Sequence, residues 1–281
     1  MPAGPAFEPY HAENVVGEVL RWKGAHSRHL AHARDILVWL PPGYHAEPGR
    51  RYPVLYLHDG QNKLDPRTSY TGLDWNVDGA ATALIERGAI EPFLMVAIYN
   101  SPDRLHEYNP LDRGGPYAAF LTTELMPVID RVFRTQQGRR NALMGSSMGG
   151  LISLAMLWWM PNIFFGAACV SPSLWVLGRA GGAAAWLARH PTPPRDTKLY
   201  MDHGTRGAEG RGAGLAREVA AFAVGAGLRK TYVRYLVARG GEHNEASWRA
   251  RVDKPLKHLF GLRKPRRGLP QGASGWTVRR P

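Results

Sequence analysis

The chain has 281 residues, 44% of them apolar and nine of them tryptophan, a composition typical of a globular protein and not of a disordered chain. Its formal charge of +13 is compatible with nucleic-acid binding. However, most of the positive charge is arginine dispersed along the chain, and no recognition motif accompanies it, so we expect no nucleic-acid partner. The one cysteine, Cys169, excludes an intrachain disulfide, and its apolar neighbours in FFGAACVSPS predict a core side chain and neither a thiol nucleophile nor a metal ligand.

No apolar run reaches the roughly 18 residues that a membrane-spanning helix needs, so we expect no transmembrane segment. The first residues, MPAGPAFEPYHAENVV, contain neither the basic start nor the apolar stretch of a secretory signal. The sequence as written therefore predicts a cytoplasmic protein, and export stays compatible with it if a signal has been removed.

Apolar segments of two kinds alternate along the chain. The first two are strand-like, at 13–22 and 34–44, and Pro41 and Pro42 stop the second. The helix predicted over 116–134 contains Pro127, which should perturb it. The remaining expected strands are 52–60, 91–100, 141–146, 164–173, 197–204 and 231–240, and the remaining helices are 74–88, 148–159, a segment within 180–189, 212–227 and 246–260.

Continuous apolar strands separated by helices are typical of an α/β protein with a mostly parallel sheet covered by helices on both faces. The two strands before the alternation predict an antiparallel N-terminal edge. No repeat or linker interrupts residues 15–262, which we assign to one domain. Residues 1–14 are assigned to an N-terminal extension, and residues 263–281, rich in Arg, Gly and Pro, to a basic, mobile C-terminal tail.

A candidate nucleophile lies between a predicted strand and a predicted helix, in GSSMGG. Gly145 and Gly149 frame Ser147 in a Gly-x-Ser-x-Gly pattern, and Ser146 is one position early. In a strand-turn-helix of this kind the serine oxygen rises above the sheet edge, beside the backbone N–H groups of the helix N-terminus. The alternative is a tight glycine-rich turn with an idle serine.

A base and an acid should follow this serine in the order serine, acid, histidine. Of the later histidines, His190 and His258 belong to helix ends or interiors and His203 closes an earlier strand. His243, in the loop GGEHNEASW after the last strand, is therefore the predicted base.

The acid is less sharply defined by its position. Asp196 precedes its strand, Glu218 is inside a helix and Glu242 adjoins the histidine itself. Two carboxylates remain near the carboxyl end of one strand. We favour Glu209, in the loop beyond that strand, with Asp202 as the alternative acid.

Four ordered motifs, LYLHDGQN, GSSMGG, SPSLW and GGEHNEASW, together resemble the "putative esterase" family of α/β-hydrolases. This family includes enterochelin-esterase-like proteins, S-formylglutathione hydrolases, feruloyl and acetyl-xylan esterases, and the antigen 85 mycolyltransferases. The resemblance covers residues 15–262 and implies the α/β-hydrolase fold. The segment NSPDRLHEY also resembles a loop that such esterases place near their site. The chain departs from the family at GTRGAEG. Many members carry a carboxylate soon after Gly-Thr, whereas here three residues, 206–208, separate Gly-Thr from Glu209.

The resemblance also implies an oxyanion hole made by two backbone N–H groups, those of Met148 and Gln61. Asn62, which follows in the same loop, is assigned to substrate binding. Three aromatic residues in loops expected at the same sheet edge could stack on a substrate ring, namely Trp75, Tyr108 and Trp175.

We therefore expect a serine hydrolase that cleaves carboxylic esters through an acyl-enzyme, without cofactor or metal. The substrate would be a small ester, aromatic or, given the positive charge, anionic. Two alternatives share this fold: an acyltransferase with the same triad, and a binding protein without catalysis.

Overall fold

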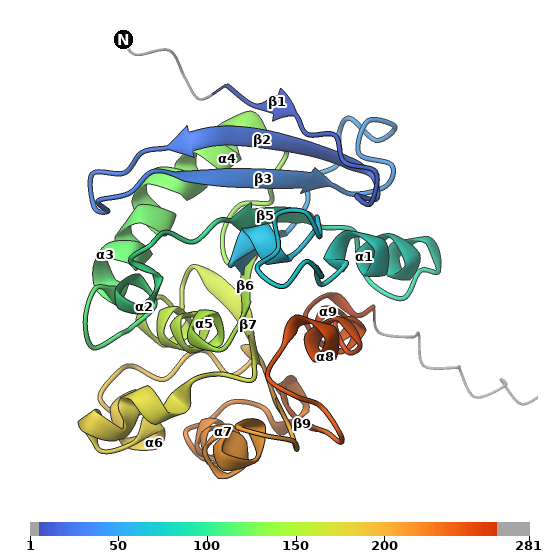
Figure 1. Ribbon diagram of the computed structural model, residues 1–281. Coiled ribbons are helices and arrows are strands. Elements are labelled where there is room, and N and C mark those ends of the chain that lie inside the picture. The colour runs from blue at the N-terminus through green and yellow to red at the C-terminus, as the bar shows by residue number, and fades with distance from the viewer. Residues whose placement is uncertain (1–5, 263–281) are drawn as a thin grey trace, which may run out of the picture.

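The computed structural model describes residues 6–262, in which a central twisted sheet separates two layers of helices (Figure 1). Within these residues the sheet has nine strands in the order β1-β2-β3-β5-β4-β6-β7-β8-β9. The expected α/β architecture is thus confirmed. The tail expected at 263–281 lies outside the described residues.

The N-terminal part of the sheet is antiparallel, as predicted. β2 (Glu18–Ala25) and β3 (Arg34–Leu40) pair with each other, and β3 joins the rest of the sheet through an antiparallel pairing with β5 (Leu94–Ile98). A two-residue strand, β1 (Glu8–Pro9), pairs with β2 although it falls inside the segment assigned to an extension.

The other strands run parallel to one another and are almost wholly buried until the far edge is reached. They are β4 (Val54–His58), β6 (Asn141–Ser146), β7 (Phe164–Val170), β8 (Lys198–Gly204) and β9 (Val233–Ala238), with β5 completing the parallel set through β4. Because both faces of β4 to β8 are covered, these strands are near-continuous apolar runs rather than alternating ones. β9 is the last strand in the order and is only half-buried.

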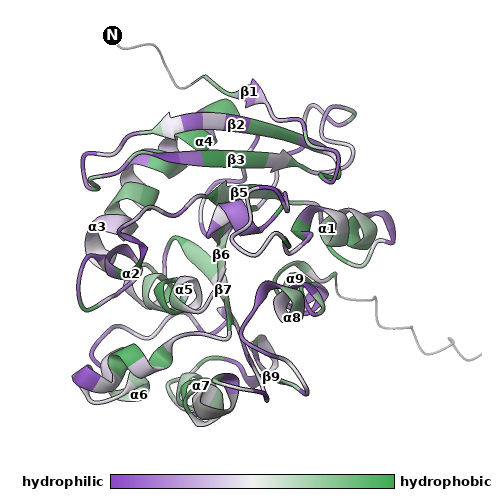
Figure 2. Cartoon of the chain, viewed as in Figure 1, coloured by the Kyte–Doolittle hydropathy of each residue, from purple (hydrophilic) through white to green (hydrophobic). Residues whose placement is uncertain are grey.

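Successive residues of a strand point to opposite faces, so each strand supplies two cores. In β6, Leu143 belongs to the core under α5 (Met148–Trp159), whereas Met144 belongs to the core under α1 (Val77–Glu86). The first core is also covered by α6 (Ala183–Leu187) and α7 (Glu209–Gly225), and the second by α8 (Glu245–Arg249) and α9 (Asp253–Phe260). Figure 2 shows the apolar colour gathered on the central strands and on the helix faces turned toward them.

The helix expected over 116–134 is present as one continuous helical segment, but its hydrogen-bonding pattern changes twice along its length. α3 (Gly114–Ala119) passes into a π-helical turn, η2 (Phe120–Leu125), and then into α4 (Met126–Val132), with Pro127 in the first turn of α4. Proline has no N–H to donate, so a change of hydrogen-bonding pattern just before it is its expected effect. A short helix, α2 (Arg104–Glu107), precedes this run.

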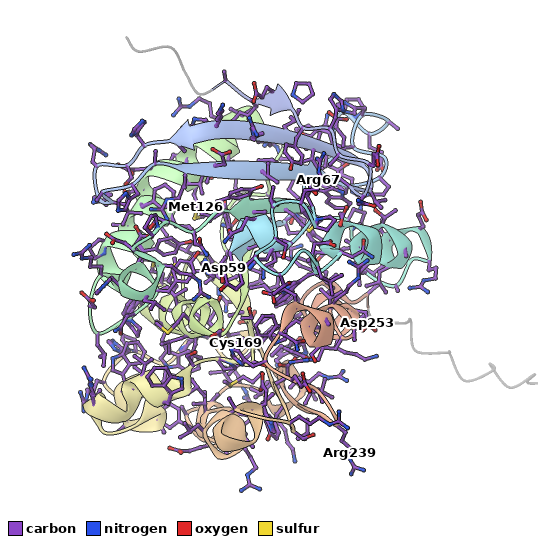
Figure 3. All side chains as sticks on the ribbon, in the orientation of Figure 1. Asp59, Arg67, Met126, Cys169, Arg239 and Asp253 are labelled. Atoms are coloured by element: carbon purple, nitrogen blue, oxygen red, sulfur yellow. The ribbon has the colours of Figure 1, made fainter. Side chains whose placement is uncertain are left out.

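Three short 3-10 segments complete the elements: η1 (Gly60–Asn62), η3 (Leu174–Ala180) and η4 (Lys230–Tyr232). Cys169 is fully buried in β7, at the centre of the molecule in Figure 3, which suits the core role expected for it. Residues 6–262 contain no helix with the length and apolarity required to cross a bilayer.

Candidate active site

Ser147 lies in the sharp turn between β6 and α5 with φ 55° and ψ −122°, a backbone conformation that is rare outside glycine. Its N–H donates to the carbonyl of Val170 at 3.0 Å, which ties the turn to the neighbouring strand. The flanking glycines permit this crossing. A Cβ on Gly145 would lie 2.6 Å from the backbone of Gly149, and one on Gly149 would lie 3.2 Å from Asp59. The close approach therefore requires glycine at 145, whereas a side chain at 149 would crowd Asp59 and His58.

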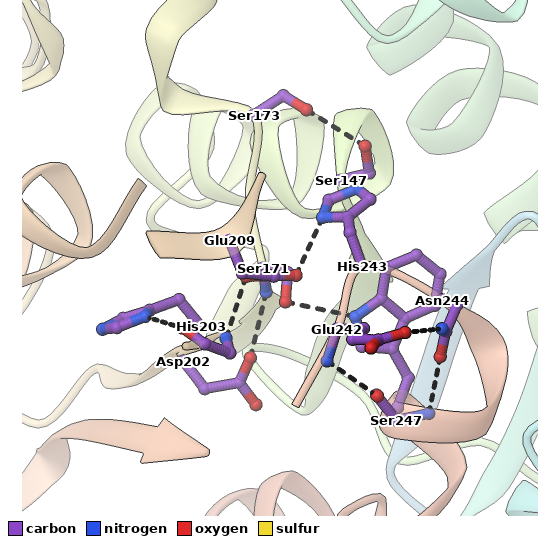
Figure 4. A network of polar contacts seen from close by, with 12 residues as sticks. Ser147, Ser171, Ser173, Asp202, His203, Glu209, Glu242, His243, Asn244 and Ser247 are labelled. Carbon is purple, nitrogen blue, oxygen red and sulfur yellow. Dashed lines mark hydrogen bonds and ion pairs between the residues drawn. The ribbon is translucent and has the colours of Figure 1, made fainter. Parts of the chain in front are cut away.

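His243 lies in the loop between β9 and α8, and Asn244 caps α8 by accepting the N–H of Ser247 at 3.0 Å. The ring Nδ1 of His243 is 2.8 Å from Oε1 of Glu209. A carboxylate oxygen can only accept, so Nδ1 donates and Nε2 carries the free lone pair. In Figure 4 the imidazole lies between Glu209 and Ser147, and all three residues line one cavity.

Glu209 is the first residue of α7, not part of a preceding loop as expected. A carboxylate at a helix N-terminus is favoured by the helix dipole. Its Oε2 accepts the N–H of Gly204 at 2.8 Å. Burial alone raises the pKa of Glu209, but hydrogen bonds from His243, Ser171 and Gly204 outweigh it and lower the pKa to about 2. Glu209 is therefore an ionised acceptor for the imidazole at neutral pH.

Asp202, the alternative acid, has its carboxylate committed elsewhere. Arg251 Nε donates to it at 2.9 Å, Tyr200 donates its hydroxyl at 2.9 Å, and the N–H of Ser171 donates at 3.0 Å. Since it is fully buried in β8 among these donors, Asp202 serves this network, and Glu209 is the carboxylate that contacts His243.

The hydroxyl of Ser147 bonds to the hydroxyl of Ser173, Oγ to Oγ, at 3.0 Å (Figure 4). Ser173 is buried, and its N–H also donates to the carbonyl of Ser147 at 3.0 Å. Sequence reasoning quoted Ser173 within SPSLW but gave it no role. The structure places it as the resting partner of the candidate nucleophile.

The loop after β4, which carries the expected oxyanion donor Gln61, packs against the start of α5 at Gly149. Gly60 is required there, because a Cβ would lie 2.5 Å from the carbonyl carbon of Ala97. Asp59 has a left-handed φ of 56° and accepts two hydrogen bonds from Arg104, at 2.6 and 2.8 Å. Gln61 follows in η1, and Met148 is the first residue of α5, where a backbone N–H has no acceptor within its own helix.

Two aromatic residues expected to stack on the substrate are not available to it. Trp75 is 1% exposed and packs on Trp248, with ring centroids 5.5 Å apart. Tyr108 is 0% exposed, and its hydroxyl accepts the N–H of Asp59 at 3.2 Å. Both expectations were wrong because a loop position does not reveal whether a side chain turns inward.

The other two candidates differ from each other. Asn62 is buried, accepts the N–H of Tyr70 at 3.0 Å and lies 3.4 Å from Glu245, so its side chain holds loops together. Trp175 is 71% exposed and lines the cavity. It is the one aromatic residue of the prediction that the structure leaves free to meet a substrate.

The cavity has a volume of about 530 Å³, within the range of small-molecule sites. No lysine or arginine is among the described residues that line it, so the lining gives no support to the expected anionic substrate. These residues come from the ends of β6 to β9 and from η3 and α7: Ser147, Ser171, Pro172, Ser173, Leu174, Trp175, Asp202, His203, Ala208, Glu209, Gly212, Leu215, Ala216 and His243.

A serine on a strained strand-helix turn in a mostly parallel sheet, followed along the chain by a carboxylate and a histidine, defines an α/β-hydrolase. Residues 27–259 match the family model described as "Putative esterase". The chain therefore belongs to this family, and it is a carboxylic ester hydrolase.

Known proteins are similar to this chain over most of its length. YbbA of Bacillus subtilis (strain 168), an uncharacterized protein, is 25% identical over 203 residues, which cover 67% of this chain and 74% of that protein. An IroE-like serine hydrolase from Shewanella oneidensis has a TM-score of 0.67 at 22% identity, covering 83% of this chain and 78% of the other.

Two further solved structures share the fold. The enterobactin esterase of Shigella flexneri has a TM-score of 0.66 at 21% identity over 89% of this chain, which spans only 60% of that longer chain. The siderophore hydrolase EstA from Aspergillus nidulans has a TM-score of 0.65 at 17% identity, covering 88% and 96%. At these identities the likeness establishes a common architecture.

Proposed function

We propose that the protein is a serine hydrolase that cleaves small carboxylic esters through an acyl-enzyme, with Ser147 as nucleophile, His243 as base and Glu209 as acid. The observation that carries this proposal is the 2.8 Å contact between His243 Nδ1 and Glu209 Oε1. It leaves Nε2 as the free acceptor in a cavity that Ser147 also lines.

In this mechanism the imidazole Nε2 takes the hydroxyl proton as Ser147 Oγ attacks the acyl carbon. The hydroxyl first leaves Ser173, its partner at rest. Glu209 keeps Nδ1 protonated and stabilises the imidazolium that forms. The imidazolium then gives its proton to the leaving alkoxide oxygen, and water attacks the acyl-enzyme by the same route.

The negative charge on the carbonyl oxygen needs donors that are already in place. We assign this role to the N–H groups of Met148 and Gln61, at the start of α5 and in η1. Donors of this kind contribute about 3 kcal/mol each to the transition state in comparable sites. Their rigidity is supported by Gly60 and by the Arg104 contacts of Asp59.

The substrate is proposed to be a small ester, since the solved relatives are named for enterobactin and siderophore hydrolysis. Ser147→Ala should abolish hydrolysis of 4-nitrophenyl acetate and labelling by a fluorophosphonate probe, while the unfolding midpoint stays near that of the wild type. Ser146→Ala, which removes a hydroxyl one position earlier, is the matched control and should keep both.

Mass spectrometry of the labelled protein should place the fluorophosphonate on Ser147. Turnover that survives in Ser147→Ala contradicts the proposal. An acyltransferase would use the same residues, and product analysis with an added alcohol distinguishes it, because transfer gives a new ester in place of the free acid.

A further inference from the structure

Several polar groups that line the cavity beside Ser147 are already paired within the protein. His203 donates through Nδ1 to the carbonyl of Gly204, and its Nε2 lies 2.6 Å from the hydroxyl of Tyr235. Asp202 is held by Arg251. Both side chains are thus held by partners within the protein.

A second set of lining residues forms an apolar wall and comes from η3 and from one face of α7 with its N-cap residue. Ala208, Gly212, Leu215 and Ala216 recur at intervals of three, four, seven and eight residues, the spacing of a single helix face. Trp175, in η3, lines the same cavity and is largely exposed. We call this space the α7 cavity.

Gly212 is the position on this wall where no side chain fills the cavity. A Cβ built on it meets no atom within 4 Å, and its backbone does not have the positive φ that would exclude other residues. A side chain at 212 would therefore start in open space, and because Gly212 lines the cavity, a larger side chain there would take up part of it.

We propose that the α7 cavity binds an uncharged, apolar group of the ester and that Gly212 determines how large this group can be. The proposal rests on the proposed hydrolase function and names the substrate class of that site. Binding of this group is favoured because it buries apolar surface against Leu215, Ala216 and Trp175. A carboxylate there would lose its hydration without meeting a cation among the described lining residues.

The group can belong to either half of the ester, and two substrate series separate these sources. The first series varies the acyl chain: 4-nitrophenyl acetate, butyrate and octanoate. The second varies the alcohol: methyl, butyl and octyl acetate. A third comparison sets 4-nitrophenyl hemisuccinate, which carries a carboxylate, against the neutral butyrate of similar length.

The variants are Gly212→Leu and the matched control Gly214→Leu. Gly214 is exposed, lies about 200° around the same helix, does not line the cavity and also has nothing within 4 Å of its Cβ. Leucine favours a helix over glycine in both, so both should fold. We expect Gly212→Leu to lower kcat/KM for the octyl or octanoyl member about tenfold or more. The acetyl and methyl members should change about twofold at most, and Gly214→Leu should match the wild type throughout.

A size limit that appears in Gly212→Leu but not in Gly214→Leu, in either series, supports the proposal and identifies the half of the ester bound. Equal profiles for the wild type and both variants in both series overturn it, as does a hemisuccinate cleaved faster than the butyrate. Failure of the proposed function is a different result: a wild-type protein that hydrolyses no ester in any series.

Discussion

The guanidinium of Arg251 and the carboxylate of Asp202 form a buried ion pair beside the candidate triad, with Nε 2.9 Å from Oδ2. The same guanidinium donates through Nη2 to Ser171 Oγ at 2.9 Å. Trp248 also donates its indole N–H to this oxygen at 3.1 Å, and its ring packs edge-on against His243. One network thus joins Asp202 in β8, Ser171 after β7, and Trp248 and Arg251 in and after α8, next to His243.

Arg251→Met should destabilise the protein by about 3–5 kcal/mol, because it leaves the Asp202 carboxylate buried without a cation. The free energy of unfolding in urea is the measurement. Arg50→Met is the matched control, since Arg50 pairs with Glu47 at 3.0 Å and both side chains are well exposed, at 37% and 53%; its cost should be about 1 kcal/mol or less. Equal losses in the two variants contradict a special role for the buried pair.

Glu209→Gln should lower kcat for ester hydrolysis by about 10³–10⁴ while KM changes little. A glutamine amide can donate to Nδ1, which favours the tautomer whose Nε2 already holds a proton and cannot take another. Steady-state kinetics on 4-nitrophenyl acetate, with the circular dichroism spectrum as a folding control, tests this expectation. A near-normal kcat in a folded Glu209→Gln variant would contradict the assignment of Glu209 as the acid of the triad.

Lys63 should make stability depend on pH. Burial lowers its pKa to about 7, against the attraction of Asp59 and Glu245, and its ammonium lies 3.3 Å from the ring centroid of Trp75. In the unfolded chain a lysine keeps its ordinary pKa of 10.5. Between pH 7 and 10.5 the unfolded state therefore binds more protons, and the free energy of unfolding rises with pH by up to about 1.4 kcal/mol per unit.

Lys63→Met removes this dependence. The difference in unfolding free energy between wild type and Lys63→Met, measured at pH 7 and pH 9.5, should move in favour of the wild type at the higher pH. Lys254→Met, which removes a more exposed ammonium paired with Asp253, controls for general effects of charge loss. An unchanged difference across this window means that Lys63 is charged in both states.

The sequence was enough to predict the architecture because its signals are local and strong. Buried parallel strands are continuous apolar runs, and glycines mark positions where backbones must meet, as at Gly145 and Gly149. The expected sheet, its antiparallel edge and the order of helices followed from these patterns. The single helix expected over 246–260 is instead divided into α8 and α9, since Arg251 and Val252 lie in a turn between them.

Side-chain direction was harder to predict, because it depends on contacts between distant segments. Trp75 and Trp248 are far apart in the sequence and pack together, and no local pattern at either position indicates it. The same holds for Arg251, which resembles the other arginines of a basic chain until Asp202 is found beside it. Glu209 was expected in a loop but begins α7. The ends of helices are the least reliable part of a prediction from sequence.

The loop that bears His243 continues from β9, the edge strand at the parallel end of the sheet, whereas Ser147 follows β6 in the interior of the sheet. Edge strands open locally more easily than central ones. Local opening of β9 would move the imidazole of His243 away from Ser147 while β4 to β7 stay paired. Turnover would then cease at a lower temperature than the one at which the protein melts, and heat inactivation would be reversible up to that point.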